Sequence, residues 1–121
     1  MTPFGIKLRE YRQQKGLTLA VMSRRLGVTE AYISQLENGR KGQPSPVLVD
    51  QICAVFGLIW DDAEELKTLA RLSRVRVVID TAGLGPEATR AANLMAQMLP
   101  RADEKEAELM ARWLEDRLKS L

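Results

Sequence analysis

Two short amphipathic helices joined by a tight glycine turn constrain the fold of this 121-residue chain more than any other feature. The first is expected to begin after Thr18, whose hydroxyl can cap a free amide of the first turn. It should end at Gly27, because glycine readily adopts the positive φ of a helix stop. The second is expected to follow a second cap, Thr29, and to end at about Asn38. Apolar residues recur at helical spacing on one side of each helix; they are Leu19, Met22 and Leu26, and then Ile33 and Leu36.

The second of these helices leaves a small and polar outer face. A helix of that kind can enter the major groove of double-stranded DNA, where a residue such as Gln35 can pair with adenine. An ordinary hairpin in a small all-α domain would share this geometry, so the geometry alone is weak support. The candidate base readers are Glu30, Ala31, Ser34 and Gln35. The candidate phosphate contacts are Thr18, Arg24, Thr29, Asn38, Arg40, Lys41 and Gln43.

The residue string itself is more specific than the geometry. LGVTEAYISQLENGR, at residues 26–40, resembles the phage-repressor (Cro-like, XRE-type) helix-turn-helix family of DNA-binding transcriptional regulators. LREYRQQKGLT, at residues 8–18, looks like the first helix of that family. The resemblance spans roughly residues 4–58 and implies a five-helix domain of the lambda-repressor type, with the third helix as the recognition helix. The matching positions are Gly27, Val28, Thr29, Tyr32, Ile33, Ser34, Leu36, Glu37, Asn38 and Gly39.

The chain departs from the family pattern at three places. Leu19 stands where the family usually has a glutamine that anchors to a phosphate, and leucine has no polar group to make that contact. Met22 and Ser23 replace a common Leu-Ala pair. The loop RKGQPSP after the recognition helix is longer than the common form, which would let its polar residues reach further along the DNA backbone.

Composition excludes several classes of function. The chain has no histidine and one cysteine, Cys53, which rules out Cys/His zinc sites and catalytic sites built on Ser-His-Asp or Cys-His. The sequence Gly83-Leu84-Gly85-Pro86 lacks the lysine of a phosphate-binding loop. We therefore expect a protein without enzymatic activity, cofactor or metal. A single cysteine, no signal peptide and no long apolar stretch favour the cytoplasm and argue against a membrane.

Charge is distributed unevenly along the chain. Residues 1–60 hold eight Lys/Arg and four Asp/Glu, whereas residues 61–121 hold ten and twelve. The basic half is the half that carries the two-helix motif, as attraction to phosphate requires.

Three further helices complete the expected DNA-binding domain at residues 1–74. They are predicted at residues 4–15, 44–56 and 61–74, with Asp61 as the cap of the last, and Cys53 is expected to be a core residue. Their apolar sides comprise Phe4, Leu8 and Tyr11, then Val47, Leu48, Ile52, Val55 and Phe56, and then Leu66, Leu69, Ala70 and Leu72.

Residues 75–86 are predicted to form a linker or a short strand. VRVVID, at residues 75–80, is β-branched and partly alternating, which suits an extended chain. A lone strand needs a partner, and no second strand is evident in the sequence. The same segment of another subunit is one possible partner.

Residues 87–121 are predicted to form a helical hairpin, with helices at 87–99 and 102–121 around Pro100. Such a hairpin buries too little surface to fold alone. It must either pack back on the first domain as a lid or pair with another copy, and we favour dimerisation because such readers commonly bind paired half-sites. The expected dimer interface comprises Leu94, Met98, Met110, Trp113, Leu114 and Leu118.

The combined features predict a sequence-specific, DNA-binding transcriptional regulator that acts as a homodimeric repressor on an inverted repeat. One alternative is the antitoxin of a toxin-antitoxin pair, whose C-terminal helices would grip a partner protein. A second is an interaction module that has lost DNA binding, for which Leu19 is the only support. Control by a small ligand has little basis, because the C-terminal half is small for an effector pocket.

Overall fold

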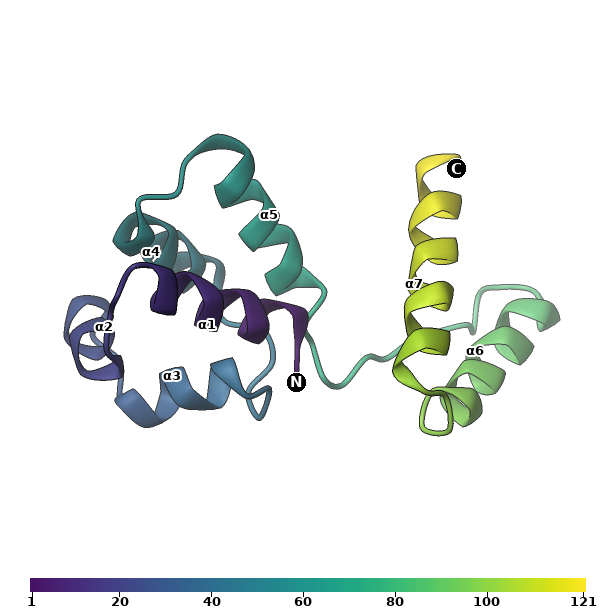
Figure 1. Cartoon of the computed structure of the whole chain (residues 1–121). Coiled ribbons are helices and arrows are strands. Elements are labelled where there is room, and N and C mark those ends of the chain that lie inside the picture. Colours follow the sequence, from purple (N-terminus) through teal and green to yellow (C-terminus); the bar gives the residue numbers. More distant parts are fainter. The chain divides into compact units, whose positions relative to one another are not determined.

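The computed structural model describes all 121 residues and contains seven helices and no strand. The chain divides into two compact units, Met1–Val77 and Val78–Leu121. The first unit contains five helices and the second contains two, and Figure 1 labels each of them. The helices are α1 (Pro3–Gln14), α2 (Leu19–Leu26), α3 (Glu30–Glu37), α4 (Pro46–Phe56), α5 (Trp60–Arg71), α6 (Pro86–Met98) and α7 (Glu104–Lys119).

The predicted two-helix motif is present as α2 and α3. The Thr18 hydroxyl accepts a hydrogen bond from the Val21 amide, and the Thr29 hydroxyl accepts one from the Tyr32 amide, at 3.1 and 3.0 Å. Gly27 ends α2 with φ of 68°, a left-handed conformation that glycine adopts without the steric cost of a Cβ. The capping residues therefore fix where both helices of the motif begin, and the glycine fixes the turn between them.

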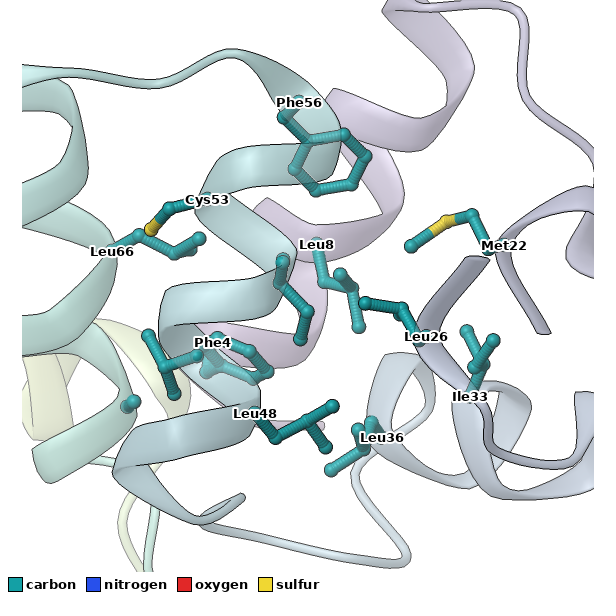
Figure 2. Close-up of a cluster of buried hydrophobic side chains, with 13 residues drawn as sticks. Phe4, Leu8, Met22, Leu26, Ile33, Leu36, Leu48, Cys53, Phe56 and Leu66 are labelled. Atoms are coloured by element: carbon teal, nitrogen blue, oxygen red, sulfur yellow. The ribbon is translucent and has the colours of Figure 1, made fainter. Parts of the chain in front are cut away.

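A single aliphatic core holds the first unit together. Figure 2 shows side chains from α1, α2, α3, α4 and α5 converging on one cluster, with Phe4 and Leu8 of α1 at its centre. Cys53 is 5% exposed within this cluster, so its predicted role in packing is confirmed. Burial raises the pKa of its thiol above the ordinary value. The other labelled members are Met22, Leu26, Ile33, Leu36, Leu48, Phe56 and Leu66.

Two predicted apolar positions are wrong. Val47 is 67% exposed, because the phase of α4 turns its neighbours Leu48 and Val49 inward instead. Leu72 is 60% exposed, because α5 ends at Arg71 and Leu72 forms the C-cap outside it.

The predicted boundaries of the fourth and fifth helices are also corrected. Ser45 caps α4, which begins at Pro46 rather than at residue 44. Asp61 does not cap α5: that helix begins at Trp60, and its N-cap, Ile59, makes no side-chain hydrogen bond. Ser73 leaves the helix to accept from the Phe4 amide and donate to the Leu69 carbonyl, at 3.0 and 2.6 Å. These two bonds fasten the start of α1 to the end of α5.

The second unit is a helical hairpin, α6 and α7. Asp103 caps α7 through a reciprocal capping box with Glu106. Residues 75–80 form no strand. No residue of α6 or α7 is buried. Met95 and Met110 are partly covered, whereas Leu94, Met98, Trp113, Leu114 and Leu118 are exposed. No helix of the chain has the length and apolar character needed to cross a membrane.

Candidate nucleic-acid interface

The outer face of α3, formed by Glu30, Ala31, Ser34 and Gln35, lies on an exposed edge of the first unit. The inner side of the helix packs its Ile33 and Leu36 into the core, and α1 and α2 are its neighbours. Figure 1 shows α3 on the side of α1 away from α5. On the outer face, Glu30 and Ala31 are exposed, and Ser34 and Gln35 are half-buried. A short polar helix supported from behind in this way can enter a DNA major groove.

The two threonine caps lie at the N-termini of the motif helices. A hydroxyl has one proton to donate and two lone pairs to accept with. Thr18 and Thr29 each use one lone pair on a backbone amide, so each retains its proton for an external acceptor. The helix dipole adds a partial positive charge at the same place. Both positions thus suit a phosphate oxygen, while the hydroxyls also hold the helix ends in place.

The basic exit from α3, Arg40 and Lys41, is folded back on the helix end. The Lys41 amide donates to the Gln35 carbonyl at 3.1 Å, and the Arg40 amide donates to the Asn38 side chain at 3.4 Å. Gly39 permits this turn with φ of 82°. Four basic residues around the motif are exposed and form no ion pair within the chain; they are Arg24, Arg25, Arg40 and Lys41.

The rest of the RKGQPSP loop is held against the end of α5. A Cβ on Gly42 would lie 2.5 Å from the Ser73 carbonyl oxygen and 3.1 Å from the Val75 nitrogen, so only glycine allows the backbones to approach this closely. Gln43 is exposed beside this contact. The first half of the loop is thereby held against both α3 and the end of α5.

A buried carboxylate fixes the C-terminal end of α3 to α1. Glu37 has a side chain only 3% exposed, and its oxygens accept from Arg12 Nε at 2.7 Å and Arg12 Nη2 at 3.0 Å. Arg9 Nε donates to the same carboxylate at 3.3 Å. We call Glu37, Arg9 and Arg12 the Glu37 clamp. The hydrogen bonds to Glu37 raise the pKa of Arg12 above its ordinary value, although burial acts in the opposite direction.

The Glu37 clamp was not predicted from the sequence, although a signal for it existed. Glu37 lies four residues after the inward-facing Ile33 and directly after the buried Leu36, on the side of α3 that faces the core. A carboxylate placed on an inward stripe needs a buried cation as partner. Arg12 also donates to the Leu17 carbonyl at 3.1 Å, so one guanidinium supports both α3 and the turn before α2.

Two of the departures from the family pattern have local consequences. Leu19 is partly buried against the core, so its side chain has no polar group to offer a phosphate. Ser23 donates its hydroxyl proton to the Val28 carbonyl across the turn between α2 and α3. That hydrogen bond stabilises the turn in addition to Gly27. No group of three or more acidic, cysteine or histidine side chains is arranged to hold a metal ion.

Comparisons with known proteins concern mainly the first unit. A family model described as a helix-turn-helix domain matches residues 3–67. The chain is similar to the uncharacterized HTH-type transcriptional regulator RghRB of Bacillus subtilis (strain 168), with 36% identity over 62 residues, 51% of this chain and 45% of that protein. It is also similar to the HTH-type transcriptional repressor RghR of the same organism, with 36% identity over 61 residues, 50% of this chain and 45% of that protein.

The chain spans about half the length of the curated relatives it matches. Among solved structures, it is similar to the crystal structure of the master regulator for biofilm formation SinR in complex with DNA. That match has 26% sequence identity and a TM-score of 0.46, and it covers 55% of this chain and 95% of the other.

Proposed function

The chain belongs to the helix-turn-helix domain family, and from this premise we propose that it is a sequence-specific DNA-binding transcriptional regulator. The observation that carries the proposal is the polar outer face of α3, backed by the core and flanked by two threonine caps and an unpaired basic exit. RghRB and RghR, which match this half of the chain, are described as a transcriptional regulator and a transcriptional repressor.

We propose a division of labour within this surface. Glu30, Ala31, Ser34 and Gln35 read base edges in the major groove, because only these side chains project from the outer face of α3. Residues around them contact phosphates and set the register of α3 on the duplex without reading sequence. These residues are Thr18, Arg24, Thr29, Asn38, Arg40, Lys41 and Gln43.

We propose further that the regulator is a homodimeric repressor, assembled through the α6–α7 hairpin, that blocks a promoter by occupying an inverted repeat. The hairpin supports this because neither helix has a buried residue, while Leu94, Trp113 and Leu118 are about half exposed or more. Apolar surface of this extent favours a partner. Two recognition helices about 34 Å apart would match successive turns of one DNA face.

In the antitoxin alternative, a different protein, rather than a second copy of this chain, binds the α6–α7 hairpin. Both readings require the apolar stripe of α6 and α7, but only the homodimer gives the purified chain twice its monomer mass. The mass of the purified chain in solution therefore separates the two.

Substituting Gln35 tests the base-reading assignment. Gln35→Ala is expected to cost about 1–3 kcal/mol on a duplex selected by the wild-type protein and to relax preference at one base pair, because the lost contact is to a base edge. Binding is measured by fluorescence anisotropy on the selected duplex and on duplexes changed at single base pairs. Gln51→Ala, the same change at an exposed position of α4, is the matched control and should leave binding unchanged. Equal weakening on every duplex would show that Gln35 does not read a base.

Substituting Trp113 tests the dimer interface. Trp113 is 64% exposed on α7, and large aromatic residues anchor many interfaces. Trp113→Ala is expected to shift the dimer to monomer in multi-angle light scattering and to reduce operator affinity, because two half-sites are no longer engaged together. Trp60→Ala, which removes an 82% exposed tryptophan from the first unit, is the control. An unchanged dimer mass in Trp113→Ala would contradict the assignment.

A further inference from the structure

The connecting segment, Val75–Thr81, presents an unusual run of apolar side chains to solvent. Val78 is 91% exposed and Val77 is 72% exposed, and Val75 and Ile79 are also more than half exposed. All four are β-branched, a side-chain type that packs well on the pleated surface of a strand. The segment contributes nothing to the core of the first unit. Its composition thus fits a strand, although the chain supplies no partner strand.

The backbone of the connecting segment is equally unsatisfied. No backbone N–H or C=O group from Val75 to Asp80 makes a hydrogen bond within the chain. A turn follows the segment at its C-terminal end, where the Asp80 carboxylate accepts a hydrogen bond from the Ala82 amide at 2.9 Å. A row of free donors and acceptors of this kind can pair with another extended chain.

The sequence of the segment is complementary to itself when it runs antiparallel. With Val78 opposite Val78 of a second copy, Arg76 lies opposite Asp80, and Val77 lies opposite Ile79. Every charged residue then faces its opposite charge, and every apolar residue between them faces another apolar residue. A shift of one residue would place Arg76 opposite Ile79. The charge pattern therefore favours a second copy of the same segment, paired with Val78 opposite Val78, over a register shifted by one residue.

Alternation along a strand also separates the two faces. Val75, Val77 and Ile79 share one face, and Arg76, Val78 and Asp80 share the other. A pair of strands would carry one face that is apolar except for Thr81, opposite Val75, and one face with two charge pairs.

The contact at Gly42 favours the same register. Pairing centred on Val77 would use Arg74, whose Cα lies 3.4 Å from where a Cβ on Gly42 would be, so its backbone is already packed against the loop. Pairing centred on Val78 can be made by Arg76 to Asp80 alone, which lie beyond the residues of that contact. It requires only that the bend at Val75 and Arg76 open.

We propose that the connecting segment pairs antiparallel with the same segment of a second copy of this chain, about a two-fold axis at Val78. The inference rests on the proposed homodimer and adds a second interface to it, because an isolated two-stranded ribbon is only marginally stable. The two copies exchange the same surface, as a two-fold dimer requires.

Disulfide trapping of the full chain tests the register directly. In the proposed ribbon Val78→Cys faces its own copy, whereas Val77→Cys faces Ile79 and lies diagonally from its own copy, beyond the reach of a disulfide. Under mild oxidation, Val78→Cys is expected to form covalent dimer about tenfold or more faster than Val77→Cys. The wild-type chain is the control for Cys53, which is buried and present in every variant.

Charge reversal supplies a second readout. Arg76→Asp and Asp80→Arg should each slow trapping of Val78→Cys, because like charges would then face each other, and the two together should restore it. Equal trapping at Val77→Cys and Val78→Cys would overturn the ribbon, as would faster trapping at Val77→Cys or a failure of the charge swap to restore the rate.

Light scattering of the reduced wild-type chain distinguishes the two proposals. If the chain is a dimer but Val77→Cys and Val78→Cys are trapped equally, the proposed ribbon is wrong and the proposed homodimer still stands. If the chain is a monomer at the trapping concentration and neither variant is trapped preferentially, both the ribbon and the homodimer are contradicted. Neither result bears on DNA reading by α3, which the Gln35 variants test separately.

Discussion

Replacing Glu37 with alanine is expected to lower the free energy of unfolding of the first unit by about 3 kcal/mol, because two guanidinium groups lose a buried partner. Arg12 is the more affected, since its side chain is only 18% exposed and three of its hydrogen bonds are made in this region. Urea denaturation monitored by circular dichroism measures the change. Glu37→Gln, which retains the shape and part of the hydrogen bonding, should have a smaller effect.

Glu65→Ala is the matched control for this prediction. Glu65 also forms an ion pair between helices, with Lys7 at 3.6 Å, but its side chain is 53% exposed. An exposed pair of this kind contributes about 0–1 kcal/mol. If Glu37→Ala were no more destabilising than Glu65→Ala, the clamp would not be what holds α3 against α1. Because we propose that α3 reads DNA, we also expect Glu37→Ala to weaken binding to a selected duplex, measured at temperatures where the variant remains folded.

Gly5→Ala is expected to destabilise the first unit by about 3 kcal/mol, because α1 and α3 approach each other at this residue with no room for a side chain. A Cβ on Gly5 would lie 2.9 Å from the Glu37 carbonyl oxygen and would also overlap the Leu36 carbonyl oxygen. Both neighbours are backbone atoms of α3, so neither can move away as a flexible side chain would. Thermal and urea denaturation both measure the loss.

The same substitution in open space isolates the steric effect. A Cβ on Gly83 would meet no atom within 4 Å, so Gly83→Ala should change stability by no more than about 0.5 kcal/mol. A Gly5→Ala variant as stable as the wild type would mean that α1 and α3 are further apart than described.

Much of the first unit is predictable from the sequence because its signals are local. Thr18, Gly27 and Thr29 mark helix ends through short-range hydrogen bonds or backbone freedom, and all three predictions are confirmed. Helix boundaries that depend on contacts with residues far away in the sequence are harder to predict. The fifth helix ends early because Ser73 turns to bond the start of α1, a partner 69 residues away. The sequence around Ser73 contains no pattern that predicts this hydrogen bond.

The candidate interface divides in the same way. The polar outer face of α3 follows from helical periodicity, and the structure leaves it uncovered as expected. The parts that hold α3 in place depend on tertiary contacts that periodicity does not reveal. They are the Glu37 clamp, the close approach at Gly5 and the contact of Gly42 with the end of α5. Helical periodicity also identified the apolar stripes of α6 and α7. Which protein packs against these stripes stays a prediction.

The most direct test of DNA reading by α3 is selection of bound duplexes from a randomised DNA pool by the full wild-type chain, followed by titration of the enriched duplex at several salt concentrations. We predict enrichment of one inverted repeat whose half-sites are about one helical turn apart, with an affinity that falls steeply as salt rises. We also predict that scrambled duplex binds far more weakly. A folded chain that enriches no sequence, or that binds selected and scrambled duplexes alike, would contradict the claim that α3 reads DNA.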